Sequence, residues 1–240
     1  MRERLLPIAR QINDALAACG FPLCKGGVMA SNPQWCLSLA EWKQRFRSWL
    51  ERPEPEALLN ASIFFDFRPL YGDDELAEQL SGWLLTAAPG QERFFNNFVA
   101  QALQRTPPIG FFRDFVVGPD AKCPDTVDLK LAGATLFVDA ARILGLKAGV
   151  QHSNTAKRLT LAAETLQINR AEAWVEAFHF IQLLRLRRQY ELLEEGEEPH
   201  NRINPYELND LDRKVFLEAL RQARKLQKCL EVRFAGGRSF

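Results

Sequence analysis

The spacing of apolar side chains over the first 60 residues predicts two amphipathic helices. Residues 3–18 carry apolar side chains about one helical turn apart, and Gly20, which favours the end of a helix, follows them. Ser38 and Glu41 have the spacing of a capping box, which begins a helix. Three aromatic residues then repeat at helical intervals: Trp42, Phe46 and Trp49.

The pattern is mixed in the next part of the chain. Residues 61–70 combine an aromatic run with one acidic and one basic residue, and the period does not separate a strand from a turn of buried helix. Residues 94–103 predict a helix. Residues 111–117 and 126–131 predict two strands joined by a turn that contains glycine and proline.

The pattern becomes helical after Gly133. Four stretches have helical periodicity, and Pro205 suits the first turn of the last one: residues 135–149, 155–166, 170–193 and 205–233. The sequence therefore predicts a mainly α fold, in which a helix bundle follows a small α+β unit. The tryptophans are expected to anchor the core or an interface between domains: Trp35, Trp42, Trp49, Trp83 and Trp174.

The composition is that of a globular protein. The chain has 240 residues, of which 47% are hydrophobic, and its formal net charge is +1. A net charge near zero provides no global attraction to nucleic acid or to an anionic membrane. The sequence has no apolar stretch near the roughly 18 residues of a membrane span, and its N-terminus does not resemble a signal peptide. We therefore expect a cytoplasmic protein that binds neither nucleic acid nor a membrane.

Seven short phrases occur in a fixed order: CKGGVMASNP (24–33), IFFDFR (63–68), PPIGFF (107–112), DLK (128–130), NTAKRL (154–159), LRLRRQ (184–189) and HN (200–201). Together they resemble the bacterial nucleotidyltransferases that carry CBS or cyclic-nucleotide-binding domains upstream. That family is similar in turn to protein-PII uridylyltransferase and glutamine-synthetase adenylyltransferase. The resemblance extends over about residues 14–234.

The resemblance implies two pieces. Residues 1–72 look like the C-terminal remnant of the nucleotidyltransferase domain, and residues 73–240 look like the helical substrate-binding domain. The implied substrates are a nucleoside triphosphate and a protein or small-molecule acceptor, and full-length relatives carry the CBS or cyclic-nucleotide-binding domains upstream. Mg²⁺ is expected for the full-length family and is not expected to bind this chain alone.

The catalytic signature of this superfamily is absent from the sequence. Nucleotidyl transfer uses a Gly-Ser turn followed by an Asp-x-Asp pair, whose carboxylates hold divalent cations at the reacting phosphate. The chain has no Gly-Ser dipeptide, and its one Asp-x-Asp, Asp210-Leu211-Asp212, lies on a predicted helix, where residues two apart diverge by about 200°. We therefore assign no catalytic or metal-binding residue and expect the motif upstream of Met1 in full-length relatives.

Two functions follow from these observations. The first is the substrate-binding portion of a nucleotidyltransferase of the protein-PII uridylyltransferase type, inactive alone. The alternative is a non-catalytic helical module that binds a nucleotide or a signalling partner.

Candidate binding residues stand in the first phrases of the resemblance. Asp66 and Arg68 form either a wall of the nucleotide site, with Arg68 on a phosphate, or a structural ion pair, because an unpaired buried charge is costly. Gly26 and Gly27 can let the backbone approach a phosphate, although a tight turn is the commoner reason for a glycine pair. Arg158 is a candidate through the resemblance alone.

Further candidates lie in the second half of the chain. Asp128 and Lys130 alternate on a predicted strand and so share one face, where Lys130 contacts either a phosphate or a neighbouring carboxylate, and Arg142 can join them. Arg185 and Arg188 lie three residues apart on a predicted helix and so face together. They bind a triphosphate or an acidic partner loop, or they lie on a solvated face balanced by nearby glutamates.

Overall fold

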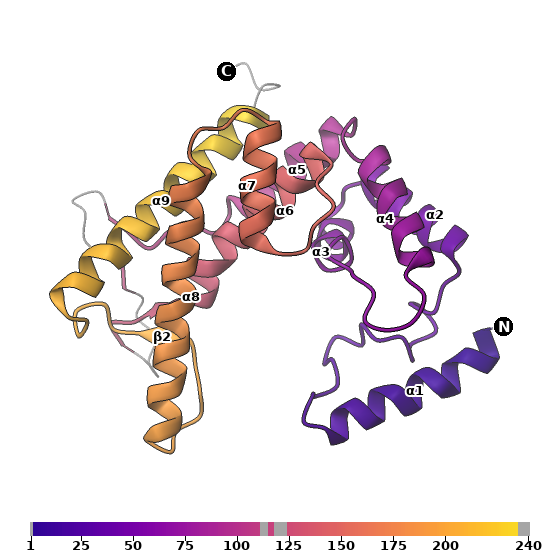
Figure 1. Ribbon diagram of the computed structural model, residues 1–240, viewed down its shortest axis with the longest axis horizontal. Coiled ribbons are helices and arrows are strands. Elements are labelled where there is room, and N and C mark those ends of the chain that lie inside the picture. The colour runs from indigo at the N-terminus through magenta and orange to yellow at the C-terminus, as the bar shows by residue number, and fades with distance from the viewer. Residues whose placement is uncertain (1, 111–114, 118–123, 235–240) are drawn as a thin grey trace.

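The prediction of a mainly α fold is confirmed. A computed structural model describes residues 2–110, 115–117 and 124–234, and its regular structure consists of helices and one two-stranded antiparallel sheet (Figure 1). The elements in chain order are α1 (Arg2–Ala18), α2 (Leu39–Glu51), α3 (Pro55–Phe64), α4 (Glu75–Ala87), α5 (Glu92–Ala102), β1 (Val127–Asp128), η1 (Lys130–Ala134), α6 (Thr135–Ala148), α7 (Thr155–Thr165), α8 (Ala171–Glu194), β2 (Arg202–Ile203) and α9 (Asp210–Phe234).

Local sequence signals set several helix ends. The Ser38 hydroxyl accepts the N–H of Glu41, and the Glu41 carboxylate accepts the N–H of Ser38, so the predicted capping box begins α2. The side chain of Asn154 accepts the N–H of Lys157 and caps α7. Gly149 ends α6 in the left-handed conformation, with a φ of 69°, which suits a residue without a Cβ.

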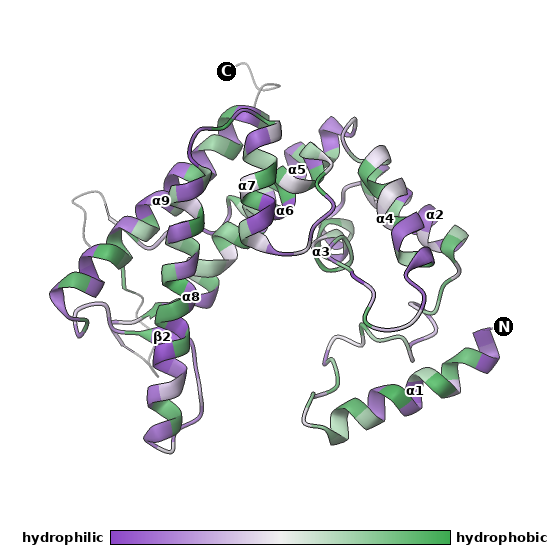
Figure 2. Cartoon of the chain, in the orientation of Figure 1, coloured by the Kyte–Doolittle hydropathy of each residue, from purple (hydrophilic) through white to green (hydrophobic). Residues whose placement is uncertain are grey.

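Helices α6 to α9 form the bundle that the periodicity predicts. Helix α6 packs along α7, and α8 packs along α9, so that the four helices lie side by side on the left of Figure 1. Their hydrophobic and hydrophilic residues alternate around each helix in Figure 2, as amphipathic helices require. Trp174, Phe137 and Phe216 are fully buried between them, which confirms that Trp174 is a core anchor.

The N-terminal helices join the same core through aromatic side chains. The Phe46 ring lies 4.9 Å from the Phe65 ring, and the Phe65 ring lies 5.9 Å from that of Phe94 on α5. The Phe95 ring in turn stacks 5.5 Å from that of Phe234 at the end of α9. One continuous hydrophobic core therefore connects α2 with the bundle, across the expected domain boundary at residue 72.

Of residues 61–70, only residues 61–64 are helical, and none of the ten forms a strand. Helix α3 extends to Phe64, and the Phe65 N–H still bonds to the Ala61 carbonyl before the chain turns. Pro55 at the start of α3 explains this outcome, since its fixed φ suits the first turn of a helix. The aromatic side chains therefore pack from a helix end and a turn and not from a strand.

The predicted hairpin of residues 111–117 and 126–131 is wrong where the structure describes it. Residues 111–114 and most of the connecting turn lie outside the described residues. Strand β1 pairs instead with β2, with Val127 opposite Ile203 and Asp128 opposite Arg202, while Phe115 bridges to Ile109. The Asp128 carboxylate accepts the backbone N–H groups of Lys130 and Leu131, so the chain turns at once into η1, a short π-helix.

The last helix begins later than the sequence indicates. It starts at Asp210 and not at Pro205. The Asn209 side chain accepts the N–H of Asp212 at 2.9 Å, which is the bond an N-cap residue makes. The polar cap at Asn209, four residues downstream, therefore outweighs the preference of proline for a first turn.

Helix α1 forms as predicted but leaves its apolar side exposed. Four side chains spaced along it are 40–55% exposed, namely Leu5, Ile8, Ile12 and Leu16, and the helix buries none of its residues against the described part of the chain. Arg2 ties it to the start of α2, with Nη2 lying 2.6 Å from the Glu41 carboxylate and Nε donating to the Cys36 carbonyl at 2.8 Å.

Replacing Glu41 with glutamine is expected to flatten the pH dependence of stability in acid. The N–H of Ser38, the Arg2 guanidinium and the Ser38 hydroxyl lower the pKa of Glu41 from 4.5 to about 2. A carboxylate with a lowered pKa stabilises the folded chain above pH 4.5, and this contribution is lost as the pH falls toward 2. Thermal unfolding across this interval should show a steeper fall of Tm for the wild type than for Glu41→Gln. Equal slopes would contradict the prediction.

Candidate functional site

A pocket of about 280 Å³ lies where α3 and α4 meet α6 and the segment that leads into α7. The α3–α4 side contributes mostly apolar and aromatic side chains together with Arg68, Glu78 and Ser81, and the side of α6 and α7 contributes Arg142 and Arg158 together with apolar residues. The lining residues are Ala61, Phe65, Phe67, Arg68, Pro69, Ala77, Glu78, Ser81, Leu84, Leu85, Phe98, Arg142, Leu146, Val150, Gln151, His152, Ser153 and Arg158. Such a cleft, apolar with a few convergent polar groups, is typical of a small-molecule site.

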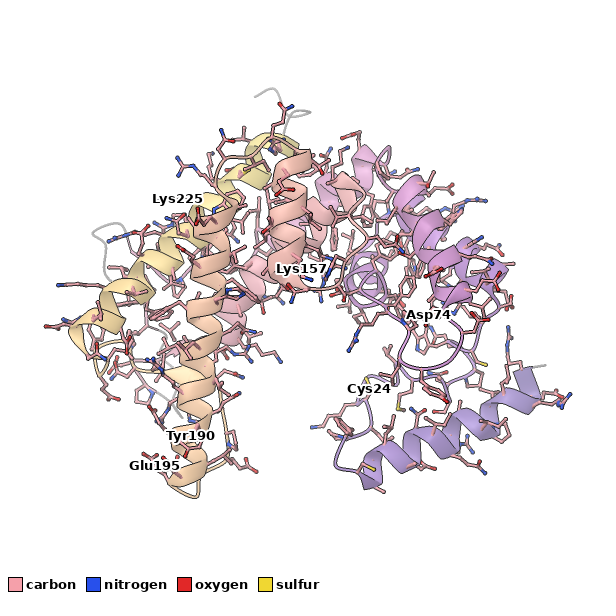
Figure 3. All side chains as sticks on the ribbon, viewed as in Figure 1. Cys24, Asp74, Lys157, Tyr190, Glu195 and Lys225 are labelled. Atoms are coloured by element: carbon pink, nitrogen blue, oxygen red, sulfur yellow. The ribbon has the colours of Figure 1, made fainter. Side chains whose placement is uncertain are left out.

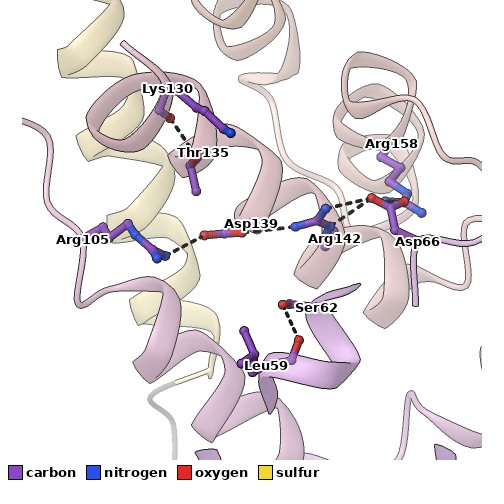
Figure 4. Close-up of polar contacts among 9 residues, drawn as sticks. All are labelled: Leu59, Ser62, Asp66, Arg105, Lys130, Thr135, Asp139, Arg142 and Arg158. Atoms are coloured by element: carbon purple, nitrogen blue, oxygen red, sulfur yellow. Dashed lines mark hydrogen bonds and ion pairs between the residues drawn. The ribbon is translucent and has the colours of Figure 1, made fainter. Parts of the chain in front are cut away.

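Asp66 joins the turn after α3 to two arginines of the helical bundle. Its Oδ2 accepts Nε of Arg142 at 3.0 Å and lies 3.0 Å from Nη2 of the same residue. Its Oδ1 lies 2.6 Å from Nη1 of Arg158, in an ion pair whose angle is not that of a hydrogen bond. Figure 4 shows the Asp66 carboxylate between the two guanidinium groups. Of the two alternatives for Asp66, the ion pair is therefore present, but its partners come from α6 and α7.

The ion pairs continue behind Arg142. Nη1 of Arg142 lies 3.4 Å from Asp139, and the other oxygen of Asp139 lies 3.7 Å from Arg105 (Figure 4). Burial raises the pKa of Asp139, while the charges of Arg142 and Arg105 oppose that rise. Each of the two aspartates therefore lies between two arginines, so cationic groups outnumber the anionic ones in this row.

Arg158 and Arg68 differ in how far their charges are satisfied. Arg158 is 9% exposed, and its Nε donates to the carbonyl oxygen of His152 while Nη1 faces Asp66. Arg68 is exposed, lines the pocket, and has no hydrogen bond or ion pair with any side chain that the structure describes. Three of the candidates from the sequence therefore lie at or beside this pocket: Asp66, Arg68 and Arg158.

Asp128 and Lys130 do not join this pocket. The strand that would have aligned them is replaced by η1, and the Asp128 carboxylate is used by backbone N–H groups, so the predicted shared face is wrong. Lys130 is exposed, and its backbone carbonyl accepts the Thr135 hydroxyl at 2.7 Å. Arg142 joins Asp66 and not this pair.

Arg185 and Arg188 lie on α8, outside the residues that line the pocket. Nε of Arg185 donates to the Asn201 side chain at 3.1 Å, and Gln189 donates to the same oxygen at 3.2 Å. Arg188 lies 3.6 Å from Glu191 on the next turn. Arg188 therefore has a glutamate neighbour, as on the balanced face that the sequence offered as one alternative, whereas Arg185 is half-buried and bonds to neutral side chains. Figure 3 shows Tyr190 and Glu195 at the C-terminal end of the same helix.

Gly26 and Gly27 lie in a tight turn between α1 and α2. Gly27 has a φ of 67°, its N–H bonds to the Cys24 carbonyl at 2.9 Å, and its carbonyl accepts the Asn32 side chain at 2.9 Å. Figure 3 shows Cys24 near α1, apart from Lys157 at the start of α7. The glycines are not among the residues that line the pocket, and the turn accounts for both of them.

Sequence reasoning missed Asp139, Arg105 and His152 at this site. Asp139 and Arg142 stand three residues apart on a largely apolar helix, which is a signal for a buried ion pair. Arg105 and His152 carry no such signal, because Arg105 follows the end of α5 and His152 contributes only a backbone carbonyl to Arg158.

The described residues do not fit a metal centre for nucleotidyl transfer. They contain no group of three or more histidine, cysteine, aspartate or glutamate side chains that could hold an ion. Asp210 pairs with Arg213 at 2.6 Å, whereas Asp212 accepts Asn209 at 2.8 Å and lies 3.3 Å from Arg187, so the two carboxylates point to different partners.

Among the described residues, no helix has the length and apolar character needed to cross a membrane.

Comparison with protein families gave two matches. Residues 1–56 match the family described as putative nucleotidyltransferase DUF294, and residues 92–234 match the family described as putative nucleotidyltransferase substrate binding domain. No curated protein and no solved structure matched the chain. The second match covers more than half of the chain and includes the bundle with Arg142 and Arg158, so the chain belongs to the nucleotidyltransferase substrate binding domain family.

Proposed function

We propose that the chain is the substrate-binding portion of a nucleotidyltransferase of the protein-PII uridylyltransferase type. The observation that carries this proposal is the pocket between α3, α4, α6 and α7, which arginine and phenylalanine side chains line together. Arginine forks suit phosphate oxygens, and an aromatic wall suits a base or another flat apolar group. A nucleoside triphosphate has both parts, and it is the donor that the family implies.

The chain alone transfers no nucleotide in this proposal. The Gly-Ser…Asp-x-Asp element that would hold Mg²⁺ is missing from the sequence, and Asp66 is already held by two arginines. The metal and the attacking acceptor, a protein or a small molecule, belong to the whole enzyme. Its upstream CBS or cyclic-nucleotide-binding domains would couple a signal to transfer in the cytoplasm.

A second function, a non-catalytic helical module that binds a signalling partner, is favoured by one surface. Four apolar side chains stand at intervals of 3, 4 and 3 residues along the outer half of α8 and are 44–63% exposed: Leu183, Leu186, Tyr190 and Leu193. Such a stripe resembles the seam of a helix that packs on another helix. Binding of a partner there does not exclude nucleotide binding in the pocket.

A thermal-shift titration with ATP, UTP, CTP and GTP, with and without Mg²⁺, tests the first function. A nucleotide that binds only the folded chain stabilises it by about 2.7 kcal/mol at 100 times its dissociation constant. We expect at least one nucleotide to raise the Tm, and no incorporation of labelled nucleotide into any protein added. A well-folded sample that responds to none of the four would sink the nucleotide-binding function and favour the partner-binding module.

A further inference from the structure

We propose that Arg68 and Nη2 of Arg158 form a phosphate subsite in the pocket, and that Asp66 is the residue that positions Arg158 for it. The inference rests on the proposed function and deepens it, because it names the group of the ligand that each residue meets. The observation behind it is that protein groups bind some of the guanidinium nitrogens and leave others open to the pocket.

The donors of Arg158 are only partly used by the protein. Nε donates to the His152 carbonyl, and Nη1 faces Asp66 at 2.6 Å, which leaves Nη2 without a hydrogen bond or ion pair to a described residue. The residue is 9% exposed and lines the pocket. A guanidinium fixed on two sides and open on the third loses little conformational entropy when it binds an anion.

Arg142 has less to offer a ligand. Its Nε and Nη2 face Asp66, and its Nη1 faces Asp139 at 3.4 Å, so every nitrogen of the group has an acidic neighbour. Arg142 therefore supplies positive charge to the pocket wall, while direct donors come from elsewhere. Arg142 and Arg158 therefore differ in the donors that they leave for a ligand, although both lie beside the Asp66 carboxylate.

Among the arginines that line the pocket, Arg68 is the one without an ion pair to a described residue. It stands two residues after Asp66, lines the pocket, and has no described acidic partner. A carboxylate also lines the pocket, that of Glu78 on α4, yet it makes no ion pair with Arg68. Arg68 and Arg158 line the same pocket from separate segments, and two guanidinium groups can hold a phosphate dianion from two sides.

The rest of the lining indicates an organic phosphate and not a free inorganic ion. Phe65, Phe67 and Phe98 line the pocket with the arginines. The volume of about 280 Å³ is at the lower end of ligand pockets, and a phosphate alone would leave most of it unfilled. A nucleotide matches both kinds of lining side chain, because its phosphates would meet the arginines and its base or sugar would meet the phenylalanines.

Asp66 acts on the ligand through Arg158 and not by contact. It is not one of the residues that line the pocket, and both of its oxygens face arginines. Removing its charge would free Arg158 to rotate and would also remove the link between the turn that carries Arg68 and helix α7. Asp66 is therefore a positioning residue, whose loss affects the phosphate part of a ligand more than its apolar part.

Isothermal titration of the full chain with ATP and with tripolyphosphate tests the subsite. Arg68→Gln should weaken binding of both by about 10-fold or more, since a hydrogen bond to a charged group contributes about 1.5–3 kcal/mol. Asp66→Asn should weaken both as well, and Asp66→Glu should restore part of the affinity. Arg93→Gln, which removes an exposed arginine of α5 outside the pocket, is the matched control and should change neither.

The outcomes separate this inference from the function on which it rests. If ATP binds the wild type but Arg68→Gln and Asp66→Asn bind it within twofold, the subsite is wrong while the nucleotide-binding function stands. If neither ATP nor tripolyphosphate binds a folded wild type, both are wrong. Should Asp66→Asn fail to fold, Arg68→Gln alone decides, because Arg68 is exposed and supports no described contact.

Discussion

Replacing Trp174 with alanine is expected to lower the free energy of unfolding by about 3–5 kcal/mol, the usual cost of deleting a buried aromatic side chain. Trp174 lies on α8, is 0% exposed, and belongs to the core shared by the bundle. Removing the indole leaves a cavity that rigid helix backbones cannot fill. Urea unfolding followed by far-UV circular dichroism measures the change, and a loss below about 1 kcal/mol would mean that the bundle is packed differently here.

Trp174→Phe is the matched control for this substitution. The indole Nε1 is buried and donates no hydrogen bond to the described part of the chain, so phenylalanine removes a polar group that is costly to bury. The smaller ring still leaves some space. We therefore expect Trp174→Phe to cost clearly less than Trp174→Ala. Equal losses would show that the indole N–H has a partner in solution, such as a bound water.

The second large effect is expected from Arg158→Met, which should lower the free energy of unfolding by about 2–4 kcal/mol. Breaking a buried ion pair by removing one partner typically costs about 3–5 kcal/mol. The value is lower here because Asp66 is 20% exposed and keeps Arg142. The His152 carbonyl also loses its donor, whereas methionine retains part of the stem that packs against Gly145 of α6.

Two further variants show whether this loss comes from the ion pair. Lys157→Met changes the neighbouring residue of α7, which makes no described side-chain contact, and should stay within about 0.5 kcal/mol of the wild type. Asp66→Asn combined with Arg158→Met should cost less than the two single substitutions together, because they share one interaction. Strict additivity in chemical denaturation would mean that Arg158 stabilises the fold through packing alone.

The site was predictable from the sequence only in part. Asp66 and Arg68 were identifiable because charges inside an aromatic run must pair or face a cleft. Their partners were not, since Arg142 and Arg158 lie 76 and 92 residues away from Asp66 and no local pattern links them. Asp128 and Lys130 were misplaced for a local reason: the Asp128 carboxylate bonds to the next backbone N–H groups and ends the strand that would have aligned them.

By itself, the sequence determined most of the helices and several of their ends. The capping box of α2, the Asn154 cap of α7, Gly149 after α6 and the apolar periodicity of α6 to α9 are local signals, acting within a few residues through backbone hydrogen bonds and the burial of one face. Only the tertiary structure decided which helices meet, where the short strands pair, and that Asp66 lies between arginines of α6 and α7. These outcomes depend on packing and on charges brought together from distant parts of the chain, and local sequence patterns do not predict such contacts.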